Sequence, residues 1–531
     1  MNGNWDRRIS RRTLLRTGGA AAVVLYGSAI PSASAGPPFA DYPFKLGVAS
    51  GEPTPNGIVL WTRLAPDPLN GGGLGDAGYR VRFEVAKDPS FLNIVHRGHT
   101  LVGPEEVHTV HAEVTGLKSE REYWYRFKSK QHESPVGRFR TAPRYGTVPE
   151  HLKFAFVSCQ NYTYGYYSAF NDLVGQDDVE LVVHLGDYIY EGPGLDGGPR
   201  THAPAATLMT LAEYRTRHAQ YKTDESLQAA HEAYPWVMTW DDHEFANNYA
   251  DLDLDPNQPL ETVAQRRAAA YLAYWEHSPL PRSRKPVDQN MSMYRRSSWG
   301  DLVLFHVLDT RQHRSDQIGS CPVPQRQFGY CPPALDPARA ILGAEQRAWL
   351  LEGLDSSTAR WNVLANQVRF APLDQNADPA ITGFLQDNWD GYVADRQRVL
   401  DFMREQKPSN PIVITGDAHV HSVRNVPPSF ESFDGTPVAV EFVGTSISTN
   451  GDGTPEGREP HFRDDTENPH RLFQCDQRGY VTVDVTPETW QADFRTVSTI
   501  ATPTSAGETV ASFVVEDGVP GATQVSPLPG V

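Results

Sequence analysis

The chain has 531 residues, more than one ordinary domain contains, so the sequence predicts two or more domains. Hydrophobic residues make up 39% of it and the mean hydropathy is −0.48, which is typical of a soluble globular protein with a large core. The formal net charge of −17 excludes a protein that coats nucleic acid, because such a protein needs a basic surface to displace counterions. A small anionic ligand remains compatible with this charge, because a few cations in a pocket dominate the local field.

The first 35 residues have the features of an export signal. Arg11 and Arg12 form a twin-arginine motif, an apolar stretch follows at 20–30, and Ala33-Ser34-Ala35 matches an A-x-A cleavage site. The apolar stretch is too short for a stable membrane span. We expect residues 1–35 to be a signal peptide for the twin-arginine export machinery, and the mature protein to be secreted to the periplasm, cell wall or exterior. The alternative is a basic N-terminal arm.

Residues 42–142 predict an all-β domain. Runs rich in β-branched and aromatic residues, at 58–63, 79–85 and 123–127, are separated by turns with Gly, Pro and Asn. Tyr123 follows Gly116-Leu117 at a spacing similar to that of the tyrosine corner in immunoglobulin-like sandwiches. We expect an N-terminal immunoglobulin-like β-sandwich, followed by a linker that ends at Pro149.

From about residue 152 the chain alternates between apolar runs that end in polar residues and helical segments such as 261–276 and 344–355. The apolar runs are 154–159, 181–187, 236–242, 302–309, 363–366 and 412–417. This alternation predicts an α/β domain with helices covering its sheets, here over residues 152–500. Residues 501–531 are rich in Pro, Gly and small residues, and we expect them to form a loose tail or a strap over the core.

Five predicted strand ends carry side chains that bind metal ions, and ligand sites in α/β folds gather at the carboxyl ends of strands. These side chains are, in chain order, Cys159; Asp187 and Tyr190; Asp241, Asp242, His243 and Glu244 with Asn247 and Asn248; Asn366 and Gln367; and Asp417 with His419. A carboxylate can bridge two ions because its oxygen lone pairs point apart, which makes Asp187 the candidate bridge. Tyrosine is a rare ligand that strongly acidic ions such as ferric iron hold as phenolate. The pattern predicts a two-metal hydrolase of phosphate esters.

The order G-D-x-x-Y, D-D-H-E and G-D-A-H resembles that of calcineurin-like and purple acid phosphatase metallophosphoesterases, and more closely that of PhoD-type alkaline phosphatases. The resemblance spans nearly the whole chain and implies an α/β fold, a two-sheet metallophosphoesterase sandwich flanked by helices. Where purple acid phosphatases have Asp, Asn and His, this chain has Cys159, Asp242 and Asp417. The added carboxylates favour a hard ion such as calcium over zinc. The resemblance likewise implies iron (Fe3+) together with calcium (Ca2+).

We assign the expected ions to the strand-end ligands as follows. The ferric ion takes the sulfur, carboxylate, phenolate and imidazole of Cys159, Asp187, Tyr190 and His419. The first calcium shares Asp187 and adds Asp242 and Asp417, with Asn366 or Gln367 as further candidates. A second calcium would draw on Glu244, Asn247 or Asn248.

The expected activity is hydrolysis of phosphomonoesters, and of phosphodiesters as well, by a metal-bound oxide or hydroxide. His243 is expected to protonate the leaving oxygen or to stabilise its charge. Arg311 is a candidate cation for the phosphate, and a structural salt bridge in the core is the equally weighted alternative. We expect a monomer that acts on small phosphate esters.

The residues are also compatible with two other functions. One is a phospholipase D-like phosphodiesterase acting on phospholipids, because the sequence does not define the pocket for the leaving group. The other is a non-catalytic cell-wall or carbohydrate-binding protein, which the full ligand set argues against, since unpaired buried carboxylates are costly without metal.

Three further features receive structural interpretations. His184 lies inside a predicted strand and is expected to be a core residue, whereas His421 is a weaker candidate for contact with the site. Cys321 and Cys331 lie ten residues apart in a loop and are candidates for a disulfide typical of exported proteins.

Overall fold

The computed structural model describes residues 36–176, 178–254, 260–318, 330–374, 383–430, 435–454 and 468–526. The expected signal peptide lies outside the described residues, and so does Cys321 of the expected disulfide. Cys331 is disulfide-bonded. Within the described ranges, no helix has the length and the apolar character needed to cross a membrane.

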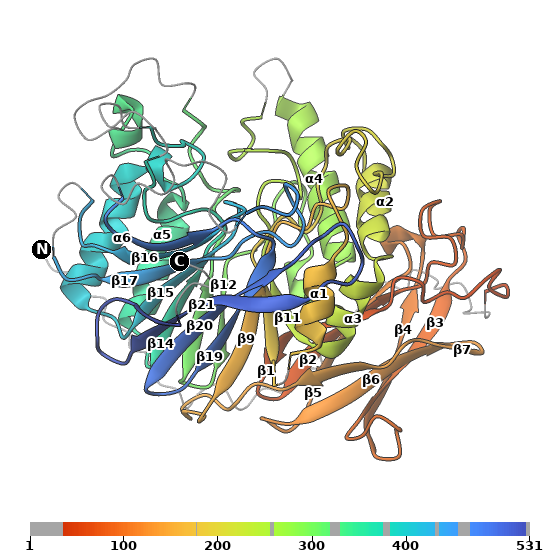
Figure 1. Cartoon of the computed structure of the whole chain (residues 1–531). Helices are drawn as coiled ribbons and strands as arrows, with labels where there is room; N and C mark the ends of the chain where they lie inside the picture. Colours follow the sequence, from red (N-terminus) through yellow and green to blue (C-terminus); the bar gives the residue numbers. More distant parts are fainter. Residues whose placement is uncertain are drawn as a thin grey trace, which may run out of the picture.

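Two large sheets form the middle of the molecule (Figure 1). The ten-stranded sheet has the spatial order β22 (Thr523–Ser526), β21 (Gly507–Glu516), β20 (Thr489–Val497), β19 (Gly479–Val485), β9 (Leu152–Val157), β10 (Leu181–His184), β11 (Pro235–Met238), β1 (Val48–Thr54), β2 (Gly57–Arg63) and β5 (Thr109–Thr115). The seven-stranded sheet has the order β12 (Arg295–Trp299), β13 (Val303–Val307), β14 (Trp361–Ala365), β15 (Pro411–Thr415), β17 (Ala439–Val443), β16 (His421–Val426) and β18 (Arg471–Cys475). This mixed α/β architecture confirms the fold class expected from the sequence.

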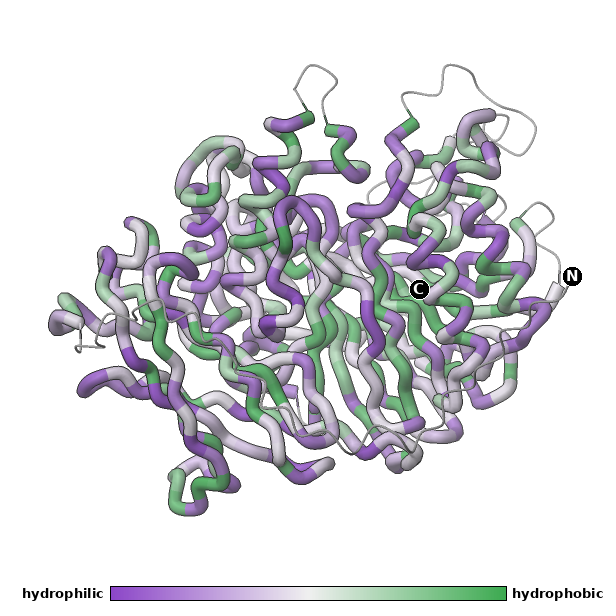
Figure 2. Tube along the Cα trace, turned by 180° about the vertical axis from the view of Figure 1, so that it is seen from behind, coloured by the Kyte–Doolittle hydropathy of each residue, from purple (hydrophilic) through white to green (hydrophobic). Residues whose placement is uncertain are grey.

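The two sheets pack face to face through an apolar core. Because successive side chains of a strand point to opposite faces, one strand serves two cores. Phe154 and Phe156 of β9 face the other sheet, where the ring of Phe154 meets Phe305 of β13 edge-on at 5.2 Å between centroids. Ala155 and Val157 of the same strand join the core on the opposite face. The strands are therefore apolar on both sides, and Figure 2 shows this apolar character along the middle of the molecule.

Helices cover the two outer faces, which gives four layers. On the ten-stranded sheet lie α1 (Ser168–Val174), α2 (Leu211–Tyr221), α3 (Glu225–Ala233) and α4 (Leu260–Glu276); on the seven-stranded sheet lie α5 (Gly343–Asp355) and α6 (Val393–Gln406) (Figure 1). The helices expected at 261–276 and 344–355 match α4 and α5. Thr210 begins α2 with a capping box that Glu213 completes, and Asp224 caps α3.

The N-terminal region is rich in β-strands, as expected, but three of its strands are continuous with the ten-stranded sheet of the α/β domain. Strand β1 pairs in parallel with β11, so that β1, β2 and β5 extend the ten-stranded sheet. A five-stranded sheet packs against them through a separate core and contains β4 (Ile94–Val102), β3 (Tyr79–Ala86), β6 (Glu122–Ser129), β7 (His132–Glu133) and β8 (Gly137–Arg140). The hydroxyl of Tyr123 accepts a hydrogen bond from the backbone N–H of Lys118 at 3.1 Å, as in a tyrosine corner. The boundary at residue 142 stays a prediction.

The C-terminal residues differ from the expected tail. Strand β21 pairs with β20 and is followed by β22 at the edge of the ten-stranded sheet. The residues of β21 that face the core, among them Ala511, Phe513 and Val515, are buried. The small residues and prolines of 501–506 hide this short alternating pattern, and the expectation of a loose tail from residue 501 was wrong.

Candidate metal centre

The carboxyl ends of parallel strands from both sheets meet at one edge of the stack. Strands β9, β10 and β11 run parallel in the first sheet, and β13, β14 and β15 run parallel in the second. Each is followed directly by a segment that carries candidate site residues, which are Cys159, Asp187, Asp241, Arg311, Asn366 and Asp417. The rigid sheets therefore bring residues that are far apart in the sequence to one place.

Four of the candidate ligands have a left-handed backbone, which non-glycine residues rarely adopt. The φ angles are 59° at Cys159, 57° at Asp187, 58° at Asp417 and 55° at His419. Gly186, with a φ of 117°, makes the turn before Asp187 possible, since a Cβ there would lie 2.4 Å from the backbone nitrogen of Asp241. Such strain persists only where surrounding contacts enforce it, and it gathers at functional sites.

One group of side chains joins sulfur, oxygen and nitrogen donors. Donor atoms of Cys159, Asp187 and His419 all lie within 4.8 Å of one another. The hydroxyl of Tyr190 donates to Asp187 Oδ2 at 2.9 Å and lies 3.4 Å from His419 Nε2. Thr449 Oγ1 lies 2.9 Å from the same hydroxyl and donates to the carbonyl of Cys159 at 2.7 Å. The four residues expected to hold iron are thus together.

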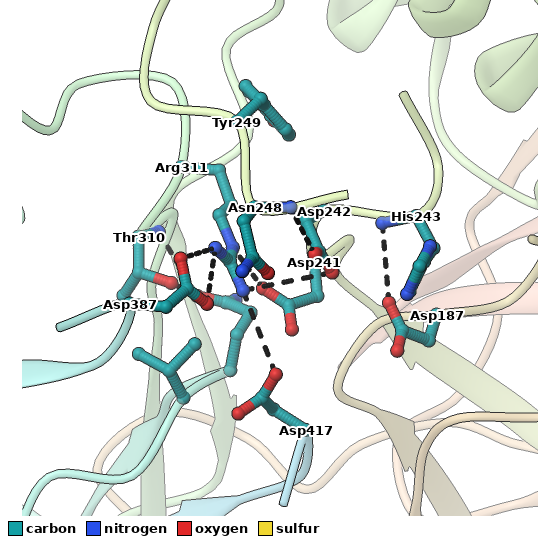
Figure 3. A network of polar contacts seen from close by, with 12 residues as sticks. Asp187, Asp241, Asp242, His243, Asn248, Tyr249, Thr310, Arg311, Asp387 and Asp417 are labelled. Atoms are coloured by element: carbon teal, nitrogen blue, oxygen red, sulfur yellow. Dashed lines mark hydrogen bonds and ion pairs between the residues drawn. The ribbon is translucent and has the colours of Figure 1, made fainter. Parts of the chain in front are cut away.

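A second group consists of carboxylates that surround Arg311 (Figure 3). Oxygens of Asp241, Asp242 and Asp417 lie within 4.8 Å of one another, and a third group links Asp242 to Asp187 and His243. Arg311 is fully buried; its Nε donates to Asp241, and its Nη1 donates to both oxygens of Asp387 at 2.7 and 2.9 Å. This is the salt-bridge arrangement that was the alternative to phosphate binding.

The electrostatics of the site fit multivalent cations. Burial, and then the Asp187 carboxylate, raise the pKa of the Cys159 thiol; burial, then Asp187 and Cys159, also raise the pKa of Tyr190. Burial raises the pKa of Asp417 well above its ordinary value, and that of Asp241 to about 6. Asp241 Oδ2 and Asp242 Oδ1 are buried without a hydrogen-bond partner. Cations among these donors would offset the crowded negative charge.

His243 lies beside the carboxylates and is held by a residue that the sequence reasoning missed. Its Nδ1 is 2.8 Å from Glu191 Oε2, and its ring stacks on Tyr190 at 4.1 Å between centroids. Burial opposes the charge of His243, but Asp242, then Glu191 and Asp187, raise its pKa well above the usual value. Glu191 directly follows Tyr190 in the sequence, and this adjacency is a signal that could have found it.

Four further residues expected at the site make hydrogen bonds of other kinds. The carboxylate of Glu244 accepts backbone N–H groups of Asp187, Tyr188 and Asp241 at 3.1, 2.6 and 2.9 Å, so it fixes the two turns rather than facing the other donors. The side chain of Gln367 is occupied by Thr239, Thr310 and the Leu308 carbonyl, whereas the amide oxygen of Asn366 accepts one bond from Trp389 at 3.3 Å. Asn247 is exposed, and its backbone N–H donates to Glu191 at 2.7 Å.

Both other histidines considered from the sequence have structural contacts. His184 is buried in β10 and accepts the backbone N–H of Gly186 at 3.2 Å, which supports the turn before Asp187. His421 is buried, with Nε2 3.1 Å from the Arg495 carbonyl. Asp387, Thr449 and Asn450 also belong to the site, and no strand-end motif marks them in the sequence; the amide of Asn450 lies 2.7 Å from His419 Nδ1.

Comparison with known proteins agrees with this geometry. Residues 154–494 match the family model described as PhoD-like phosphatase, and residues 31–143 match the model of its N-terminal domain. The chain belongs to the PhoD-like phosphatase family. It is 45% identical over 508 residues to alkaline phosphatase D of Bacillus subtilis (strain 168), an alignment that covers 93% of this chain and 84% of that protein.

Solved structures give the same relationship. The structure titled "Structure of PhoD" superposes with a TM-score of 0.87 at 43% identity, covering 93% of this chain and 94% of the other. A purple acid phosphatase from yellow lupin (Lupinus luteus) seeds shares the fold, with a TM-score of 0.54 at 11% identity over 88% of this chain and 73% of its own. The PhoD-type resemblance expected from the motifs is confirmed.

Replacing Glu244 with Gln tests how this PhoD-like phosphatase keeps its turns in place. The substitution Glu244→Gln puts an amide N–H2 group against backbone donors, so it should lower the unfolding free energy by about 2–4 kcal/mol. Chemical denaturation measures this, and metal analysis should show less bound metal. Glu150→Gln, at an exposed position, is the matched control. Unchanged stability and metal content in Glu244→Gln would contradict the positioning role.

Proposed function

We propose that this PhoD-type alkaline phosphatase hydrolyses phosphomonoesters and phosphodiesters outside the cytoplasm, with ferric iron and calcium in the strand-end site. The observation that carries the proposal is that Asp187 belongs to two donor groups, one with Cys159 and His419 and one with Asp242 and His243, and that Asp242 also belongs to the carboxylate group with Asp241 and Asp417. A shared carboxylate is the means by which two ions are held close enough to act on one phosphate. The secretion route rests on the twin-arginine motif at Arg11 and Arg12.

The residues assigned to each ion follow the chemistry of the donors. Iron would be held by Cys159, Asp187, Tyr190 and His419, and calcium by Asp187, Asp242 and Asp417, with the free lone pair of the Asn366 amide oxygen as a further donor. When bound, such ions neutralise phosphate oxygens and make water a nucleophile at moderate pH. A second calcium at Glu244 and Asn247 receives less support, because three backbone N–H groups occupy Glu244.

His243 is the residue proposed to move a proton. Glu191 fixes Nδ1, and the Tyr190 ring restricts the imidazole from one face. Nε2 is then the atom that can donate to the leaving oxygen of the ester. Asp242, Glu191 and Asp187 raise the pKa of the imidazole against the effect of burial, which favours the protonated form that a general acid needs. Arg311 serves to hold Asp241 and Asp387 in place, since its Nε and Nη1 are bonded to them.

The substrate class is tested with three esters and the purified mature protein. We expect p-nitrophenyl phosphate to be hydrolysed with the highest kcat/KM, bis-p-nitrophenyl phosphate more slowly, and phosphatidylcholine slowest. Asp187→Asn, purified in the same way, should lose activity by at least about 10³-fold, which excludes a contaminating phosphatase. A preference for phosphatidylcholine over both nitrophenyl esters would instead support the phospholipase D-like alternative.

The metal assignment predicts a coloured protein. Phenolate bound to ferric iron absorbs visible light, so Tyr190→Phe should remove the band while the control Tyr164→Phe keeps it. A calcium chelator should abolish hydrolysis, and added calcium rather than zinc should restore it. Metal analysis measures the iron and calcium content, and a visible spectrum measures the absorption band. A colourless, iron-free and fully active preparation would exclude the iron site.

The role of His243 is tested by varying the leaving group. An alkyl phosphate needs a proton on its departing oxygen, whereas p-nitrophenolate leaves without one. His243→Asn should therefore lower kcat about 10²–10⁴-fold for glycerol 3-phosphate and less than about tenfold for p-nitrophenyl phosphate. His99→Asn, at an exposed position of β4, is the control. Equal losses for both esters would show that His243 is not the acid.

A further inference from the structure

A cavity of about 490 Å³ extends from the carboxylate group of the site. Its lining includes Asn248, Asp387 and Asp417, which belong to the candidate metal centre, and Arg369, Leu373 and Gln474, which do not belong to the donor groups. None of the proposed iron ligands is among the described residues that line it. The volume suits a small molecule, and the lining is mixed apolar and polar, as in ligand sites. The cavity is therefore placed to receive the part of a substrate that lies beyond the reacting phosphate.

Arg369 on the wall of this cavity is buried without a partner. Its residue surface is 3% exposed, and its Nε has no hydrogen-bond partner. Among the described residues the Arg369 side chain makes no ion pair or hydrogen bond; its backbone carbonyl alone accepts one, from Trp389 at 3.4 Å. A buried guanidinium that lacks an acceptor is costly, because its charge and the N–H group of Nε lose their water.

The acidic residues near Arg369 are bonded to other groups. Glu441 accepts the backbone N–H groups of Phe370 and Ala371 and pairs with Arg424 at 3.1 Å. Asp390 pairs with Arg396 at 2.6 Å. Burial, and then the nearby Arg424 guanidinium, lower the pKa of Arg369, and the carboxylates of Asp390, Asp417 and Glu441 offset this only in part.

One of the two carboxylates on the cavity wall is paired with cations. Asp387 accepts from Arg311 and Arg314, and its Oδ1 also accepts from Gln317. Asp417 lies with Asp241 and Asp242 in the carboxylate group, and Arg311 Nη2 is 3.8 Å from it. Among the described residues no carboxylate is bonded to the Arg369 guanidinium, which lines a space large enough for a ligand.

We propose that Arg369 binds a second anionic group on the alcohol part of the substrate, either a carboxylate or a second phosphate. The inference rests on the proposed phosphatase site and names its substrate class: small phosphate esters with a second negative charge. The phosphate that reacts lies at the metal centre, Leu373 and Val420 contact the carbon skeleton, and Arg369 pairs with the far charge. A guanidinium binds carboxylate and phosphate equally well through paired N–H groups.

The wild-type holoenzyme gives the first test, with two matched substrate pairs. We expect kcat/KM for 3-phosphoglycerate to exceed that for glycerol 3-phosphate by roughly tenfold or more, because the two differ only in the carboxylate that replaces a hydroxymethyl group. The second pair tests a second phosphate as the anionic group: it compares kcat/KM for propane-1,3-diyl bisphosphate with kcat/KM for 3-hydroxypropyl phosphate. A preference in one pair alone identifies which anion Arg369 binds.

Variants at Arg369 give the second test. Arg369→Met should raise KM for the doubly charged esters roughly 10–100-fold while p-nitrophenyl phosphate changes less than about threefold, a readout that also reports on folding. Arg369→Lys keeps the charge and should recover part of the loss. Arg144→Met removes an exposed charge and should leave both substrate pairs unchanged.

The outcomes separate this inference from the function on which it rests. If wild-type enzyme hydrolyses p-nitrophenyl phosphate without preferring either doubly charged ester, the phosphatase assignment stands and the role of Arg369 is wrong. If Arg369→Met lowers kcat/KM equally for every ester, Arg369 binds the phosphate common to all of them, and the inference is again wrong. The wild-type comparison remains decisive if the variants fail to fold.

Discussion

Mutual repulsion among buried acidic groups is the constraint on which the site of this phosphatase depends. Asp187, Asp241 and Asp242 are buried where little water is available to screen them, the partly exposed Asp417 joins them, and like charges at such distances are strongly unfavourable. The chain holds them in place with a buried guanidinium at Arg311, with N–H groups of neighbouring turns, and with backbone angles that these residues rarely adopt. The protein fixes an arrangement that is unfavourable by itself, and cations among the donors would convert it into a stable one.

The stacked sheets make this arrangement possible. Parallel strands end at the same edge, and the packing of two sheets face to face places two such edges beside each other. The apolar side chains of each strand pack into the cores on its two faces. The residues that follow the strand lie outside these cores, so their side chains can be polar and can bind ligands. Glu244 then ties the turns after β10 and β11 together through three backbone N–H groups. The carboxylate of Glu244 therefore acts indirectly, because it fixes the positions of Asp187 and Asp241.

Much of the fold and the site follows from sequence, because strand ends leave a local signature. The apolar runs before Cys159, Asp187 and Asp417 are strands in the structure, and the residues after them converge as the motif order predicted. The sequence gives no such signal for contacts between residues that are far apart along the chain. Nothing near Asp387 marks it as the partner of Arg311, and Glu244 resembles a ligand in the D-D-H-E run although its oxygens accept backbone bonds. The strands beyond residue 506 were missed because their alternation is short and the flanking residues resemble a tail.

Arg311 and Arg369 have different surroundings, and they therefore have different roles in the proposed recognition of a substrate with two anionic groups. The Nε and Nη1 groups of Arg311 are bonded to carboxylates of the site and only Nη2 lacks a hydrogen-bond partner, so cations and His243 would supply most of the positive charge for the reacting phosphate. Arg369 keeps its donors because Glu441, Asp387 and Asp390 are already bonded to other groups. A charge that is buried, uncompensated and directed at a cavity remains a stable part of a fold only if its energetic cost is offset elsewhere or by a ligand. The reacting end of the site therefore determines the chemistry, whereas the Arg369 end can determine which esters are hydrolysed.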